Sequence, residues 1–402
     1  MKRKLGPATL AVATFAFAGA AQATNGDQMI GVSATQWGMG GAAVAAPQDA
    51  GTILTNPAGI ATLGIKEVRF DTGIGLLNPP RKVNGFESDS NFYMMPSGAV
   101  AFNVNDRAFI GLGMGGLSGM GVDFPDVAAA PGNQSFVTTK QFFKVAPGLA
   151  YRVTDKLSIG GAINIDYQSL AIYNAGFSLP QNQVYGYGAT LGAIYKLNDM
   201  VQLGASWISR QKMSDFKWNI AGGNATFPAP LGFQTWTGGT AELQMDAPQQ
   251  ISFGIAVRPI KSLLIEADVK HIGFSDVMNS IPVTRTGGLP PSVPAAFNFG
   301  WEDQWVYAIG AQYDLNDRTQ LRVGLNYGES PIGPEDVNNN IGSLAVTELH
   351  ATVGVTRWWT DRIATSVSYA HAFHNKVTSN VAPFNTIELE QNILTLQVTY
   401  RF

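Results

Sequence analysis

The chain has 402 residues, of which 45% are hydrophobic and only 14% are charged, and its formal net charge is −3. Ordinary soluble proteins carry roughly 25% charged residues, so this composition is unusually poor in charge. The lack of cysteine excludes a disulfide scaffold and thiol chemistry, and the lack of a basic excess gives no reason to expect a nucleic-acid partner.

The N-terminus has the pattern of a secretion signal. Residues 2–4 are all basic, residues 5 to about 21 are apolar, and residues 21–23 read Ala-Gln-Ala. This order of basic head, apolar stretch and small-residue site is typical of a cleaved signal peptide. We therefore predict a signal peptide over residues 1–23. No later apolar run reaches the ~18 residues that a transmembrane helix needs.

Residues 24–65 follow the predicted signal and have a composition of their own. They contain the runs Trp37-Gly38-Met39-Gly40-Gly41 and Asn56-Pro57-Ala58. The stretch is too rich in glycine for a helix and too irregular for a strand. We expect it to form a separate compact segment.

From residue 66 onward, short turns separate stretches of alternating apolar and polar residues. The turns are rich in Asp, Asn and Pro and lie at 105–107, 154–156, 198–200, 259–261, 316–318 and 360–362. Strands on both sides of these turns give about fourteen, at 66–77, 92–104, 108–119, 142–153, 157–173, 184–197, 201–218, 243–258, 262–274, 304–315, 319–328, 347–359, 363–374 and 387–402. Long loops are expected near 120–141, 219–242, 275–303 and 328–346. Short turns on one side and long loops on the other are typical of outer-membrane barrels.

The last strand supports the same fold class. Leu394, Leu396, Val398, Tyr400 and Phe402 alternate with polar residues, so one face of the strand is apolar and the other is polar. An aromatic residue at the end of such a strand predicts a signal for the barrel assembly machinery, here Phe402. We predict an all-β protein, a transmembrane antiparallel β-barrel of about 14 strands, over residues 66–402.

A barrel of this size has an interior too wide for its own side chains to fill. We therefore predict that residues 24–65 form an N-terminal plug, or hatch, in the lumen. Charged strand residues such as Arg152, Glu266, Asp268 and Lys270 are predicted to face the lumen, because an Arg or Lys facing lipid at the midplane would cost ~2–4 kcal/mol.

The run from Gly38, Gly40 and Gly41 to Asn56-Pro57-Ala58 resembles the hatch of the FadL family, the long-chain fatty acid transporters of Gram-negative outer membranes. Relatives in that family move toluene-like hydrocarbons. Outside the hatch the resemblance is one of architecture. It implies passive uptake of hydrophobic small molecules across the outer membrane, with long-chain fatty acids as the first cargo and aromatic hydrocarbons as the alternative. It implies no catalytic residue, metal or cofactor.

The resemblance also implies a route. Cargo captured by the loops would enter the lumen and leave sideways through a gap at the third strand. Gly113, Gly115 and Gly116 lie in that strand, and glycines weaken a continuous ladder. Tight packing against the hatch is the other interpretation of these glycines. The implied partners are the hydrophobic ligand, outer-membrane lipid and lipopolysaccharide, and the assembly machinery, and we expect a monomer.

Some features depart from the family or point elsewhere. The loop near 174–183 is short where the family has a large one, so no carboxylate-binding residue is carried over. Lys140, Lys144, Arg210, Lys212 and Arg285 are expected to be outer charges of the loops or the lipopolysaccharide layer. His371 and His374 fall on opposite strand faces and cannot share a metal. A structural or adhesin-type barrel and a general porin remain alternatives, although a plug argues against an open pore.

Overall fold

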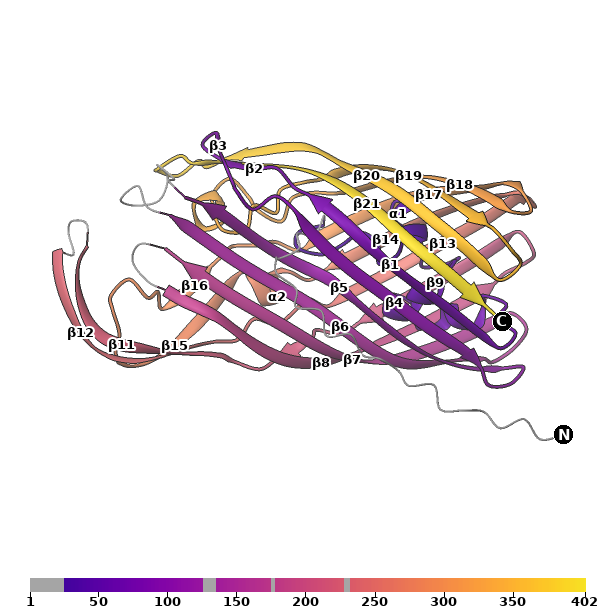
Figure 1. The fold of residues 1–402 in the computed structure, drawn as a ribbon, viewed down its shortest axis with the longest axis horizontal. Helices are drawn as coiled ribbons and strands as arrows, with labels where there is room; N and C mark the ends of the chain where they lie inside the picture. The colour runs from indigo at the N-terminus through magenta and orange to yellow at the C-terminus, as the bar shows by residue number, and fades with distance from the viewer. Residues whose placement is uncertain (1–24, 126–134, 175–177, 228–231) are drawn as a thin grey trace.

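The computed structural model describes residues 25–125, 135–174, 178–227 and 232–402, so the predicted signal peptide over residues 1–23 lies outside the described residues. Its wall is a closed antiparallel barrel (Figure 1). The wall strands are β1 (Val68–Asn78), β4 (Tyr93–Asn103), β5 (Ala108–Phe124), β6 (Phe136–Arg152), β7 (Leu157–Tyr173), β8 (Ser178–Lys196), β9 (Val201–Ile208), β13 (Gln250–Ile260), β14 (Leu263–Ile272), β17 (Gln304–Asn316), β18 (Thr319–Gly328), β19 (Leu349–Trp358), β20 (Ile363–Thr378) and β21 (Thr386–Arg401). The first and last strands close the ring, with Phe70 opposite Tyr400. This confirms the predicted barrel of 14 strands.

Alternation of side chains gives the wall an apolar outer face and a polar inner face. In β18, Leu321, Val323 and Leu325 are 41%, 56% and 50% exposed, whereas the intervening Arg322 and the following Asn326 are buried. Successive residues of a strand point to opposite faces, so the apolar side chains form the outer surface. Such an outward apolar band is the surface that a barrel presents to lipid.

Short turns join the strands at one end of the barrel, where the C-terminus also lies (Figure 1). The side chain of Asn105 accepts hydrogen bonds from the amides of Arg107 and Ala108 at 3.0 and 2.9 Å. Asn and Asp side chains favour tight turns through such local bonds. Phe402 continues the closing ladder, because its amide donates to the carbonyl of Val68 at 2.9 Å.

The opposite end carries more regular structure than the sequence pattern predicted. The stretches expected as loops near 219–242 and 275–303 hold a second sheet of β11 (Phe216–Phe227), β12 (Gly232–Leu243), β15 (Ser280–Gly288) and β16 (Ala296–Asn298). The strand expected over 201–218 is wrong as one element, since β9 ends at Ile208. The chain then passes through β10 (Lys212–Met213), which pairs with β8, into β11. Alternation specifies the faces of a strand but not its partner, so the change of sheet was not visible in the sequence.

Smaller elements complete this end. They are β2 (Arg81–Val83), β3 (Phe86–Glu87), α2 (Ser275–Met278) and η3 (Val337–Asn339). Buried apolar side chains, including Phe124, Phe216, Phe274 and Trp301, form one large cluster here. None of the helices within the described ranges is both long and apolar enough to span a membrane.

Candidate functional site

Residues 25–65 fold as three short helical turns inside the ring of strands (Figure 1). They are α1 (Ala34–Gly38), η1 (Ala50–Leu54) and η2 (Pro57–Ala61), so the expectation of no helix in this stretch is wrong. Ser33, Asp49 and Asn56 stand at the three N-caps, and each accepts a hydrogen bond from a backbone amide of its own turn. Capping side chains satisfy amides that a helix leaves unpaired, which lets such short turns persist despite the glycines.

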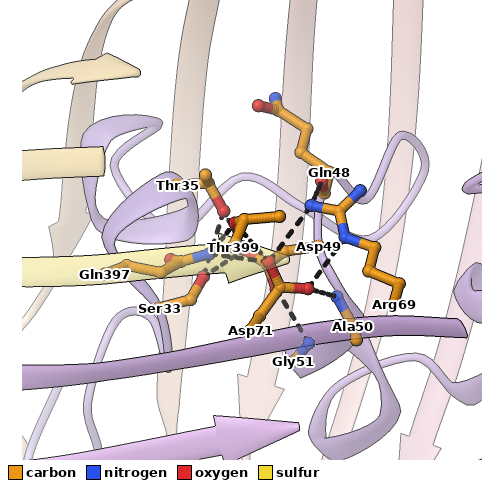
Figure 2. A network of polar contacts seen from close by, with 10 residues as sticks. All are labelled: Ser33, Thr35, Gln48, Asp49, Ala50, Gly51, Arg69, Asp71, Gln397 and Thr399. Atoms are coloured by element: carbon orange, nitrogen blue, oxygen red, sulfur yellow. Dashed lines mark hydrogen bonds and ion pairs between the residues drawn. The ribbon is translucent and has the colours of Figure 1, made fainter. Parts of the chain in front are cut away.

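A buried polar network joins this segment to the closing strands β1 and β21 (Figure 2). Asp71 of β1 accepts from the Ala50 amide at 2.8 Å and from Arg69 Nε at 2.8 Å. Arg69 also donates to the Gln48 carbonyl at 2.8 Å. The Asp49 carboxylate accepts from Ser33 at 2.5 Å. The segment is therefore fastened where the barrel closes.

A second attachment lies on β14. Asp268 accepts hydrogen bonds from the amides of Ala43 and Val44 at 2.8 and 3.0 Å. Glu266 accepts from the amides of Ala45 and Ala46 at 2.6 and 2.9 Å. Both carboxylates face the lumen, as the sequence predicted, and both bind backbone rather than a charged partner.

Asn56-Pro57-Ala58 packs against two glycines of the wall. The Asn56 amide donates to the Val44 carbonyl at 2.7 Å, and its side-chain oxygen accepts from the Ala58 amide at 3.3 Å. A Cβ added at Gly192 would lie 1.9 Å from the Asn56 oxygen, and one at Gly160 would lie 2.4 Å from the Ala58 nitrogen. The motif thus lies against the inner backbone of β7 and β8, where only glycine leaves room for it.

The other motif glycines also lie against the wall. Gly40 and Gly41 have φ values of +66° and +85°, a region that favours glycine. The Gly40 carbonyl accepts from Asn326 of β18 at 3.0 Å, and the Gly38 carbonyl accepts from Thr352 of β19 at 3.2 Å.

Sequence reasoning missed the complementary glycines of the strands. Added Cβ atoms would lie less than 3.0 Å from backbone of the segment at several inward positions, namely Gly160, Gly204, Gly310 and Gly324. A glycine at an inward position of several strands is a signal that was present in the sequence. It marks the level at which the wall contacts the segment.

The wall is interrupted between β4 and β5. Their ladder runs from Asn103–Phe109 to Ser97–Gly115 and stops there, although β5 continues to Phe124. Pro96 follows the last pair on β4 and has no amide proton to donate. On its other side, β5 has a bulge between Gly116 and Ser118 in its pairing with β6. A bulge bends a strand locally, as here beside the end of the ladder.

The start of the segment takes the place of β4 along this part of β5. The Met29 amide donates to the Leu117 carbonyl at 3.1 Å, and the Gly119 amide donates to the Asp27 carbonyl at 3.3 Å. The Asp27 carboxylate accepts from Ser118 at 2.7 Å and forms a buried ion pair with Lys140. Lys140 is therefore a lumenal residue, and its assignment to the outer charges is wrong.

The three glycines of the third strand have different surroundings. A Cβ at Gly113 would lie 2.3 Å from Ile53, so that glycine is required by packing. A Cβ at Gly115 would meet only ordinary contacts from 3.5 Å, and one at Gly116 would meet no atom within 4 Å. Packing against the segment does not require the last two.

A small cavity lies beside this region. It measures about 50 Å³ and is lined by Lys144 and Lys270 together with Gln28, Met29, Leu117 and Phe142. Lys144 is only 3% exposed, so it too is lumenal rather than an outer charge. Asp166 lies opposite Lys144 in the ladder, and neither of its carboxylate oxygens has a hydrogen-bond partner among the described residues.

A larger cavity of about 550 Å³ lies at the short-turn end. It is bounded by Ala46 and Thr62 of the segment and by Arg152, Lys196 and Arg258 of the wall. Its charged lining suits water and ions rather than an apolar molecule.

A closed antiparallel barrel with an apolar outer band and a filled lumen defines a plugged outer-membrane β-barrel. The family model for "Outer membrane protein transport protein (OMPP1/FadL/TodX)" matches residues 9–402, and the chain belongs to this family. It is accordingly an outer membrane transporter of hydrophobic compounds.

Individual relatives agree with this assignment. A 47 kDa outer membrane protein of Pasteurella multocida is 25% identical over 433 residues, which cover 98% of this chain and 97% of the relative. The toluene transporter TodX of Pseudomonas putida has the same fold, with a TM-score of 0.75, 19% identity, and coverage of 94% of this chain and 100% of that one. A FadL homologue of Pseudomonas aeruginosa has a TM-score of 0.75, 14% identity, and the same coverages of 94% and 100%.

Proposed function

We propose that this protein takes up long-chain fatty acids and releases them sideways through the gap between β4 and β5, with residues 24–65 acting as the hatch. The single observation that carries the proposal is the end of the β4–β5 ladder at Ser97–Gly115, beside a segment that pairs with β5 in place of β4. An apolar molecule leaving there would enter the lipid directly.

The two ends of the lumen favour this route over an axial one. The outer end is filled by the apolar cluster around Phe124 and Trp301, which suits a greasy cargo. The axis is occupied by residues 25–65, and the cavity beyond them is lined by charged residues such as Arg152 and Arg258. An apolar chain gains nothing by entering that polar space.

The choice of a fatty acid over an aromatic hydrocarbon is supported by the cavity with Lys144 and Lys270. Ammonium groups beside Met29 and Phe142 offer a charged partner and an apolar surface at one place, which suits a carboxylate with an alkyl tail. A hydrocarbon such as toluene carries no group that could accept a hydrogen bond from either ammonium. The volume of about 50 Å³ accommodates a head group but not a whole chain.

The route is tested by replacing Gly115 and Gly116 together by Val. The free space at these positions would be filled, and β-branched residues favour a regular pleat. We expect whole-cell uptake of labelled hexadecanoate to fall at least about tenfold, while binding in detergent is kept. Gly161→Val is the matched control, because an added Cβ there meets only ordinary contacts from 3.4 Å.

Wild-type uptake from the double variant, at equal surface abundance, would refute the lateral route. Uptake of toluene but not of hexadecanoate by the unaltered chain would refute the fatty-acid cargo and favour the aromatic alternative. A large steady ion conductance in planar bilayers would instead favour a general porin.

A further inference from the structure

Arg81 is a buried cation that has no counter-ion among the residues that the structure describes. It stands in β2 and has 0% of its surface exposed. Its Nη1 donates to the Tyr93 hydroxyl at 2.9 Å, to the Ser90 carbonyl at 3.3 Å and to the Gly121 carbonyl. Among the described residues, no carboxylate lies within ion-pair distance of it. A buried charge left in this state is strongly unfavourable, which indicates that a partner is missing.

The unused part of the guanidinium is one whole edge. Nε and Nη2 are both shielded from solvent, and neither has an acceptor within the described ranges. These two nitrogens point the same way in the plane of the group. Parallel N–H bonds from such an edge are the geometry in which arginine binds a carboxylate bidentately. The bonds of Nη1 and the Tyr93 ring, whose centroid is 5.1 Å from the guanidinium carbon, hold the plane in place.

The position of Arg81 relates this edge to the gap in the wall. Gly121, its carbonyl partner, lies in the part of β5 that no longer pairs with β4. Two residues further along, the Asp123 carbonyl accepts from the Asp89 amide at 2.8 Å, so the first outer loop bridges the gap above Arg81. Arg81 therefore lies at the outer border of the opening.

Apolar side chains approach from both sides. Leu77, Met95 and Ile393 form a buried cluster with Tyr93, and Leu389, which pairs with Arg81 in the ladder, belongs to the large outer cluster. The unpaired guanidinium edge, placed between two apolar surfaces, matches a molecule with an anionic head and a long apolar tail. It does not match a neutral hydrocarbon.

We infer that Arg81 binds the carboxylate of the cargo at the outer border of the β4–β5 gap, at a position separate from the cavity with Lys144 and Lys270, and thereby selects alkanoic acids over neutral hydrocarbons. This inference rests on the proposed function. The edge is closed off in the resting structure, so cargo must part the side chains around it. The carboxylate then supplies the missing negative charge.

The test is equilibrium binding to the purified full-length barrel in detergent, with hexadecanoate, hexadecan-1-ol and acetate as probes. Arg81→Met should weaken hexadecanoate binding about tenfold or more, the usual effect of losing hydrogen bonds to a charged group. Binding of hexadecan-1-ol should stay the same. Arg81→Lys should bind hexadecanoate with an intermediate affinity, because lysine keeps the positive charge but lacks the two parallel N–H bonds. Arg357→Met removes an exposed arginine that bonds Thr319 and is the matched control.

Equal hexadecanoate binding by wild type and a heat-modifiable Arg81→Met barrel would overturn the inference while leaving the proposed function intact. Tight binding of acetate alone would also overturn it, because the site would then serve small anions. If Arg81→Met does not fold, Tyr93→Phe decides, since it removes one of the three acceptors that hold Nη1 in place and leaves the charge intact. This variant should weaken hexadecanoate binding severalfold, and unchanged binding would count against a carboxylate site at Arg81. If the wild type binds no hexadecanoate, the fatty-acid proposal fails and this inference fails with it.

Discussion

At the scale of the residue, side chains with hydrogen-bond partners in the segment and in the wall carry the proposed site. Asn56 is buried and bonds both the Val44 carbonyl and the Ala58 amide. Glu266 and Asp268 bind amides that would otherwise be unsatisfied inside the lumen. These contacts make the position of residues 25–65 depend on a few polar atoms.

Asn56→Ala should therefore loosen the segment without unfolding the wall. Removing an N-cap costs about 1 kcal/mol, and the Val44 carbonyl also loses its donor. We expect slower hexadecanoate uptake at unchanged surface abundance, measured in whole cells. Asn56→Asp is the comparison, because it retains the acceptor for Ala58 but not the donor. Unchanged uptake in both variants would count against a hatch role.

The buried carboxyl group of Asp49 predicts that the stability of the folded protein depends on pH. Burial, and then the charge of Asp71, raise the pKa of Asp49 from 3.8 to about 6. The folded chain keeps this proton at pH values where the unfolded chain has lost it. Its contribution to stability is therefore complete below about pH 4 and is lost as the pH rises through about 6, at about 1.4 kcal/mol per pKa unit. Thermal unfolding in detergent should show this slope, and Asp49→Asn should flatten it. A slope that persists in the variant would assign it to other groups.

At the scale of the element, the start of the segment must separate from β5 if cargo is to leave between β4 and β5. Gln28 and Ser118 form an antiparallel bridge across this contact. The chain has no cysteine of its own, so a pair introduced here would be the sole disulfide. Directly opposed residues of antiparallel strands lie within the range of a disulfide.

Gln28→Cys with Ser118→Cys should lock this contact. We expect uptake to be lost under oxidation and restored by a reducing agent. The reduced double variant and each single variant are the controls, since all of them lack the Ser118 or Gln28 contacts without being locked. Full uptake by the oxidised, cross-linked barrel would show that the segment and β5 need not separate.

At the scale of the whole molecule, the barrel is expected to fold without the segment of residues 25–65, which fills its lumen. The ring closes through β1 and β21 without help from residues 25–65. Deleting residues 24–60 should therefore leave a heat-modifiable barrel that conducts ions steadily in planar bilayers, whereas the intact chain should conduct little. Failure of the deleted chain to reach the membrane would mean that the segment is needed to build the wall.

The sequence by itself was enough to predict the fold class, the number of wall strands and which side chains of each strand face outward or into the lumen. Alternation has a period of two residues, and short turns of Asn and Asp interrupt it, so both signals are local. The short runs at Phe402 and around Asn56 were also visible in the sequence, and their roles as assembly signal and hatch motif stay predictions. The lumenal orientation of Glu266 and Asp268 followed from the cost of charges in lipid.

Tertiary structure alone decided which strand edges stay unpaired and what occupies them. The ladder of β4 and β5 ends at Ser97–Gly115, and residues about 90 positions earlier in the chain, around Asp27, take over the edge of β5. The burial of Lys140, Lys144 and Arg81 depends on such long-range neighbours as well. A strand pattern records which face a side chain is on. It contains no information on the distant backbone that meets that face. A gap at the third strand was therefore expected only from the family resemblance, and the residue where the β4–β5 ladder ends, the cavity and the unpaired edge of Arg81 could not be predicted.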